Sequence, residues 1–146
     1  MTISIAADHA GYILKEHIKE YLEKKGHTLI DLGTHSSNRT DYPDYAHPLA
    51  MSVESKESEF GISICGSGNG INMTVNKHQE IRSAICWNVD IAELARRHNN
   101  ANVCALPARF ISKDLAIEIL DKFLSTSFDG GRHQIRIDKI PFLKNK

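Results

Sequence analysis

A cysteine stands at the start of a glycine-rich loop, in the stretch Gly61-Ile-Ser-Ile-Cys65-Gly-Ser-Gly-Asn-Gly70. An apolar run that ends in Cys and then breaks into alternate glycines is typical of a buried strand that delivers a thiol to a turn. The backbone amides of such a turn can bind an anion, so they favour the thiolate and can stabilise an oxyanion that develops beside it. The pattern therefore predicts a reactive thiolate at Cys65.

The spacing of the glycines separates this function from three others. A dinucleotide fingerprint is G-x-G-x-x-G after the first strand, whereas here the pattern is Gly66-x-Gly68-x-Gly70 after the third expected strand, which is a weak match. A Walker loop ends in G-K-[ST], and this loop continues into Ile71-Asn72. A thiol phosphatase needs an Arg six residues after the Cys, where this chain has Ile71. Acid–base chemistry therefore fits the loop better than nucleotide binding or phosphoryl transfer.

The two other cysteines, Cys86 and Cys104, lie within apolar runs. Cysteine is among the most buried residue types, so packing is the simplest interpretation of both. An odd number of cysteines without a C-x-x-C pair argues against a disulfide framework and against a zinc site. We expect all the thiols to be reduced.

The composition argues against a large charged partner. The chain has 146 residues, with 18 basic and 18 acidic side chains, so no global field recruits nucleic acid or an anionic membrane, and any anion must be held locally. The sequence begins with a strand pattern rather than a signal peptide, and no apolar stretch approaches the roughly 20 residues of a membrane span. We expect one domain over residues 1–146 and a cytoplasmic location.

Short apolar runs alternate with helical periodicity along the chain. Strands, apolar on both faces as a covered parallel sheet requires, are predicted over 3–7, 28–32, 62–65, 83–87 and 103–106. Helices are predicted over 12–25, 45–56, from Gly70 onward, 90–98 and 113–125, with Asn88 and Ser112 as caps of the last two. These βα units predict an α/β fold, a three-layer α/β/α sandwich with a five-stranded parallel Rossmann-like sheet.

Ligands of such folds bind beyond the carboxyl ends of the strands. Asp8 and His9 follow the first expected strand and Cys65 ends the third, so we expect the three side chains at one edge of the sheet. An Asp in such a position is about as often a turn cap as a ligand. Both interpretations of Asp8 stay open on the local sequence.

The segment after Gly130-Gly131 carries two arginines, Arg132 and Arg136. Residues four apart point the same way on a helical turn, so the pair could bind one phosphate dianion, with Arg109 and His9 converging from elsewhere. A solvated basic tail is the alternative.

Several motifs, in the same order along the chain, resemble the B-type ribose-5-phosphate isomerase family, which includes bacterial allose- and galactose-phosphate isomerases. They are Ile5-Ala-Ala-Asp-His-Ala-Gly11, Asp31-Leu-Gly-Thr34, Thr40-Asp-Tyr-Pro43, Ile64-Cys-Gly-Ser-Gly-Asn-Gly70, Asn76-Lys77, Arg97-His-Asn-Asn-Ala-Asn-Val103 and Gly130-Gly-Arg-His-Gln-x-Arg136. The resemblance implies interconversion of ribose 5-phosphate and ribulose 5-phosphate without metal or cofactor. It also implies a homodimer, or a dimer of dimers, with active sites at the subunit interface and the tail of about 130–146 against the partner.

Aldose–ketose isomerisation removes a proton from C2 and returns one to C1, so it needs a base, an oxyanion site and a ring-opening acid. The resemblance implies that Cys65 is the base and that His98, whose imidazole can titrate near neutral pH, assists ring opening. Ser67, where many relatives have Thr, could relay a proton between O1 and O2, and Tyr42 could line the sugar. The expected substrate-binding residues are Asp8, His9, Gly66, Ser67, Gly68, Asn69, Gly70, Asn99, Arg109, Arg132 and Arg136, and we expect no metal ligands.

Three functions remain open at this point. The first is an isomerase of a phosphorylated pentose, the second an isomerase of a phosphorylated hexose such as allose 6-phosphate or galactose 6-phosphate, and the third a non-catalytic sugar-phosphate-binding module. The joint presence of Cys65, Ser67, His98 and the arginines favours catalysis over binding alone. The pentose is preferred to the hexose on the resemblance.

Overall fold

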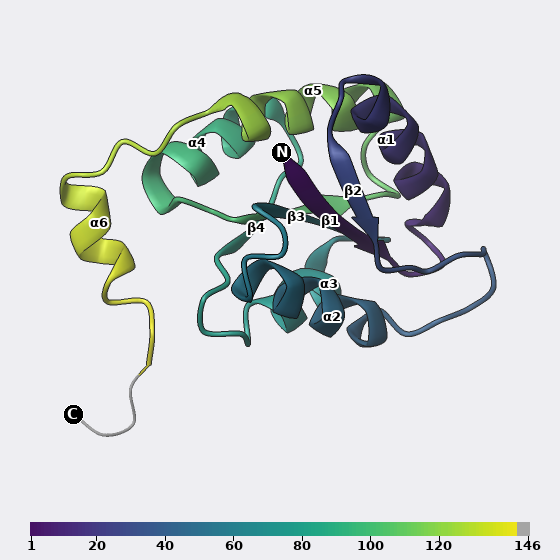
Figure 1. The fold of residues 1–146 in the computed structure, drawn as a ribbon, viewed down its shortest axis with the longest axis horizontal. Helices are drawn as coiled ribbons and strands as arrows, with labels where there is room; N and C mark the ends of the chain where they lie inside the picture. The colour runs from purple at the N-terminus through teal and green to yellow at the C-terminus, as the bar shows by residue number, and fades with distance from the viewer. Residues whose placement is uncertain (143–146) are drawn as a thin grey trace.

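The computed structural model describes residues 1–142 and has a parallel sheet with helices on both faces (Figure 1). The strands are β1 (Thr2–Ala7), β2 (Thr28–Asp31), β3 (Phe60–Cys65), β4 (Ser83–Ile85) and β5 (Val103–Pro107). The helices are α1 (Tyr12–Lys24), α2 (Pro43–Glu54), α3 (Asn69–Val75), α4 (Val89–Asn99), α5 (Lys113–Ser125) and α6 (Arg132–Ile137). The five strands pair in the order β2-β1-β3-β5-β4, which confirms the predicted fold class.

The sheet separates two apolar cores because successive side chains of a strand point to opposite faces. Ile62, Ile64 and Leu106 face the core under α1, α4 and α5, whereas Cys65 and Val103 face the core under α2 and α3. Figure 1 shows these two groups of helices on opposite sides of the sheet. The thiol of Cys65 is thus delivered to the α2 and α3 side, at the end of its strand.

The expected caps of two helices are present. The Asn88 side-chain oxygen accepts from the Ile91 amide at 2.8 Å, and the Ser112 hydroxyl accepts from the Leu115 amide at 3.0 Å. Each satisfies one of the amides that a helix start leaves without an internal partner. Helix α6 lies beyond α4 at one end of the molecule (Figure 1) and belongs to the predicted tail of about 130–146, of which 143–146 lie outside the described residues. Within residues 1–142, no helix is both long and apolar enough to cross a membrane.

A buried ion pair links α1 to β2, next to the end of β1. Lys15 is fully buried, and its Nζ donates to both carboxylate oxygens of Asp31 at 2.7 Å. Asp31 Oδ1 also accepts from the Gly33 amide at 3.0 Å, and the Gly33 carbonyl accepts from the Ala7 amide at 2.7 Å. Burial acts to raise the pKa of Asp31, but the hydrogen bonds from Lys15, Lys19 and Gly33 outweigh it and hold the pKa below its ordinary value.

We expect Lys15→Ala to lower the free energy of unfolding by about 3 kcal/mol at pH 7, because it leaves a half-buried carboxylate with Lys19 as its remaining cation. Urea unfolding measures the loss. The stabilisation from Asp31 is present above its unfolded pKa of about 4 and is lost as the pH falls through its lower folded pKa. The difference between the two proteins should therefore shrink below about pH 4. Lys24→Ala, which breaks an exposed pair with Glu20, is the control, and an equal loss there would contradict the assignment.

Candidate active site

A pocket of about 380 Å³ opens where β1 and β3 end side by side. The chain leaves β1 toward β2 on one side, and it leaves β3 toward β5 and β4 on the other, so the pocket lies at the topological switch point of the sheet. A larger groove of about 620 Å³ runs along α1, but Lys, Glu and His side chains dominate its lining and it contains no thiol. The residues that line the pocket at the switch point are Asp8, His9, Ala10, Tyr42, Cys65, Gly66, Ser67, Gly70, Arg109 and Phe110.

Cys65 is the last residue of β3, and its residue surface is 4 % exposed. All the cysteines are free, but Cys86 and Cys104 are fully buried within the other core. Burial raises the pKa of the Cys104 thiol, and a hydrogen bond with Cys86 acts in the same direction. Of the three cysteines, Cys65 is therefore the one that lines the pocket at the switch point.

The glycines of the loop serve the packing of the protein itself as well as the pocket. Gly68 has a φ of +75°, which favours glycine, and caps α3, which begins at Asn69 rather than at the expected Gly70. A methyl group at Gly70 would come within 2.7 Å of Tyr42 Cε1, so glycine lets the tyrosine ring lie over the start of α3. Gly68 and Asn69 do not line the pocket, and the Ser67 hydroxyl accepts from the Asn69 amide at 3.2 Å.

Asp8 caps a turn, as one interpretation predicts, and it also lines the pocket, where the other interpretation would place it. Its Oδ1 accepts from the amides of Ala10 at 2.9 Å and Gly11 at 3.2 Å. The side chain is consequently held in place before any ligand binds. A carboxylate fixed in this way at a strand end can accept hydrogen bonds from hydroxyl groups of a sugar.

His9 is held by the loop that follows β2. Its Nδ1 lies 3.2 Å from the Thr40 amide and 3.1 Å from the Thr40 carbonyl, and its own amide donates to the Thr40 hydroxyl at 3.2 Å. Nδ1 can accept from the amide or donate to the carbonyl, depending on the tautomer, and in both cases Nε2 is the nitrogen left for a ligand. Where Nδ1 accepts, Nε2 carries the ring proton and can donate to a phosphate oxygen.

Arg109 supplies a positive charge at the rim of the pocket. Its amide donates to the Gly66 carbonyl at 3.0 Å, and its guanidinium covers Gly66 so closely that a methyl group there would lie 3.0 Å from Nη1. The exposed guanidinium can bind an oxyanion through two N–H groups.

His98 and Asn99 lie at the end of the sheet where the strands begin, whereas the pocket lies at the other end, where β1 and β3 finish. They end α4, just before β5, whose first residue Val103 pairs with Gly61 near the start of β3. Cys65 pairs with Pro107 at the other end of β5, about 13 Å further along the strand. Within one chain the structure therefore does not bring His98 to Cys65.

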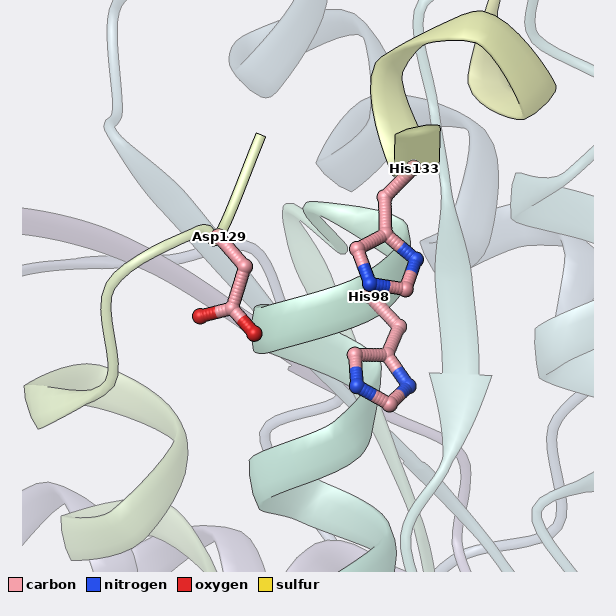
Figure 2. Close-up of side chains that lie close together, drawn as sticks. All are labelled: His98, Asp129 and His133. Atoms are coloured by element: carbon pink, nitrogen blue, oxygen red, sulfur yellow. The ribbon is translucent and has the colours of Figure 1, made fainter. Parts of the chain in front are cut away.

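A second group of the predicted site residues lies on helix α6 and at the end of α4. The rings of His98 and His133 stack with centroids 4.3 Å apart and an interplanar angle of 10°, with Asp129 beside them (Figure 2). Arg97 Nη2 lies 3.1 Å from Asp129 Oδ2, and the Asp129 amide donates to the Arg97 carbonyl at 3.0 Å.

Arg132 and Arg136 are exposed on α6, four residues apart as predicted. They lie with the His98 group and do not line the Cys65 pocket of their own chain. Sequence reasoning did not single out His133, although the motif that suggested the two arginines contains it. Burial lowers the pKa of His133, and the charges of His98 and Arg132 act in the same direction.

The chain forms a doubly wound parallel sheet, and a thiol, a carboxylate, an imidazole and a guanidinium lie at its switch point. These features define an α/β enzyme suited to acid–base chemistry on a small anionic ligand. The chain belongs to the ribose/galactose isomerase family, whose model matches residues 3–140. The resemblance found in the motifs is thereby confirmed.

The names of similar proteins and solved structures agree with this family. The chain is 42 % identical over 144 residues to ribose-5-phosphate isomerase B of Escherichia coli, covering 99 % of this chain and 97 % of that protein. The ribose-5-phosphate isomerase B structure of Clostridium thermocellum superposes with a TM-score of 0.95 at 46 % identity, covering 96 % of this chain and 95 % of the other. That of Mycoplasma genitalium, with bound ribulose-5-phosphate, gives 0.91 at 43 % identity, covering 95 % and 93 %.

Proposed function

We propose that this protein interconverts D-ribose 5-phosphate and D-ribulose 5-phosphate. The observation that carries the proposal is the convergence of Cys65, Asp8, His9 and Arg109 on one pocket, in a chain of the ribose/galactose isomerase family. A relative of 43 % identity was solved with bound ribulose-5-phosphate, the product of this reaction.

In the proposed mechanism Cys65 removes the proton from C2 of the open-chain sugar and gives an enediolate. Amides of the loop that begins at Gly66 hold the negative charge, and the Ser67 hydroxyl relays a proton between O1 and O2. Asp8 and Tyr42 bind sugar hydroxyls. The proton returns to C1 from the Cys65 thiol, so the reaction is balanced without a redox partner or a metal ion.

We further propose that the active site is completed by a second copy of the chain. His98 and Asn99 would then reach the pocket from the partner subunit, and so would Arg132 and Arg136. The support is that these residues form one group with α4 and α6, at the opposite edge of the sheet from Cys65. In a twofold-symmetric dimer each chain gives its group to the other, so both sites are complete. A homodimer is sufficient, and a dimer of dimers would contain the same pairs.

Phosphate binding follows from the same assembly. Arg132 and Arg136 of one chain and Arg109 and His9 of the other would surround the phosphate, at the end of the sugar away from C1 and C2. The dianion would balance the positive charge that these groups bring together.

A second candidate substrate is a phosphorylated hexose, because the family description includes galactose as well as ribose isomerases. We expect the purified protein to convert ribose 5-phosphate with a higher kcat/KM than allose 6-phosphate or galactose 6-phosphate, and to keep its rate in EDTA. Parallel rate measurements on the three sugars test this. A higher kcat/KM on a hexose would favour the alternative, and loss of all turnover in EDTA would contradict the metal-free mechanism. Binding without turnover of any of the three would indicate the non-catalytic module.

A further inference from the structure

Two histidines meet on the side of the molecule formed by α2 and α3, and neither lines the Cys65 pocket. His47 is exposed on α2, and His78 follows the end of α3 with 18 % of its side chain exposed. His47 Nδ1 and His78 Nε2 lie 2.9 Å apart, and the rings are tilted by 50°. Two imidazole nitrogens bound to one tetrahedral metal ion at 2.0–2.1 Å lie about 3.3 Å apart, so the contact would have to lengthen by about 0.4 Å and the rings would have to turn until both lone pairs point at the ion.

A carboxylate holds one of the two rings in the orientation that a metal ligand needs. His78 Nδ1 lies 2.9 Å from Glu54 Oε2, and the other oxygen of Glu54 accepts from the Glu80 amide at 3.2 Å. With its Nδ1 proton on Glu54, a neutral His78 presents the lone pair of Nε2, as histidines that bind metal commonly do.

The contact between the two rings is compatible with the same site. In the tautomer of His78 that carries its proton on Nδ1, Nε2 can only accept, so His47 Nδ1–H is then the donor. A metal ion would replace that proton, and the neutral His47 ring would carry its proton on Nε2, which lies on the exposed side chain. The change is a tautomer shift, so neither imidazole needs to lose its last proton.

The cluster of His98, Asp129 and His133 is a weaker candidate, although its ligand atoms lie within 4.8 Å of one another. Its imidazoles are stacked almost parallel, so their lone pairs run side by side instead of meeting at one point (Figure 2). Asp129 is already paired with Arg97, and Arg132 lies next to His133 in the chain. Positive charges of this kind favour an anion over a metal dication.

We propose that His47 and His78 form a binding site for a divalent transition-metal ion, with Glu54 as the residue that orients His78 and with water completing the coordination. Imidazole ligands suit Zn²⁺, Ni²⁺ and Cu²⁺ better than Mg²⁺ or Ca²⁺. The ion would link α2 to the end of α3. Because α2 follows Tyr42 and α3 follows the glycine loop, this link would brace two elements of the pocket without entering it.

Calorimetric titration of the untagged protein with Ni²⁺ tests the site. We expect the affinity to fall at least tenfold in His47→Ala and in His78→Ala, and by about tenfold or more in Glu54→Gln, where the charge that orients His78 is lost. His35→Ala, which removes another exposed histidine, is the matched control and should bind as the wild type does. Ni²⁺ should also raise the melting temperature of the wild type more than that of His47→Ala, which changes an exposed side chain and should fold normally.

Three outcomes would overturn the proposal. One is a wild-type protein that does not bind Ni²⁺, and another is unchanged Ni²⁺ affinity in both His47→Ala and His78→Ala. The third is loss of binding in His133→Ala alone, which would assign the ion to the cluster on α4 and α6. These readouts are independent of the proposed isomerase activity. That activity should persist in His47→Ala, because His47 does not line the pocket.

Discussion

Replacement of Cys65 by alanine is expected to lower kcat by about 10²–10⁴-fold or more while sugar-phosphate binding survives. The thiol borders the pocket at the end of β3, and it is the group that we propose takes the proton from C2. The groups proposed to hold the phosphate lie elsewhere, at His9, Arg109 and the α6 arginines. Steady-state rates on ribose 5-phosphate and calorimetric binding of ribulose 5-phosphate measure the two effects separately.

Two further variants separate proton transfer from packing. Cys65→Ser nearly preserves the volume of the side chain, but a hydroxyl ionises far less readily than a thiol, so this variant should also be inactive. Cys86→Ala removes a sulfur from a fully buried site in the other core and should leave turnover largely intact, at some cost in stability. A Cys65→Ala protein with the wild-type rate would exclude the thiol as the base.

The alternation of strands and helices along the chain could be predicted because local patterns specify each element. Apolar runs in a parallel sheet differ clearly from the helical stripes between them, and Asn88 and Ser112 mark helix starts by their side-chain chemistry. The predicted strand over 62–65 begins two residues later than β3 (Phe60–Cys65), because Gly61 is atypical of a strand. In the structure a methyl group at Gly61 would come within 2.8 Å of Leu49 Cδ2, so the close packing of α2 on the sheet requires glycine there.

The burial of Lys15 was not predicted. The sequence places this lysine beside the apolar positions of α1, but it does not show which residue faces it in the fold. The partner is Asp31 on β2, sixteen residues further along the chain. Only the pairing of β2 with β1 brings that carboxylate under the helix.

One half of the candidate site could be predicted from strand ends, and the other half could not. Asp8, His9 and Cys65 meet because parallel strands end at the same edge of a sheet. The stack of His98 on His133 depends on how the tail folds back onto α4, and no periodicity in residues 126–131 reports that path. The separation of this group from the pocket is also a property of the whole fold, and motif order along the chain contains no information about it.

Two inactive variants are expected to restore activity to each other. We expect equal amounts of Cys65→Ala and His98→Ala, unfolded and refolded together, to regain about a quarter of the wild-type activity. Random pairing makes half of the dimers mixed. In a mixed dimer one site has both defects, while the other combines the intact Cys65 of one chain with the intact His98 of the other. Assays of the refolded mixture against each variant refolded alone measure the recovery.

The double variant Cys65→Ala/His98→Ala provides the opposite control. Mixed with an equal amount of wild type without exchange of subunits, it should leave half of the activity, all in wild-type dimers. After exchange the value should fall to about a quarter, because each site of a mixed dimer then lacks either Cys65 or His98. If Cys65 and His98 of the same chain acted together, the two single variants would show no recovery and the double variant would leave half of the activity after exchange as well. Since His98 and Cys65 lie at opposite edges of the sheet in one chain, we expect the first pattern.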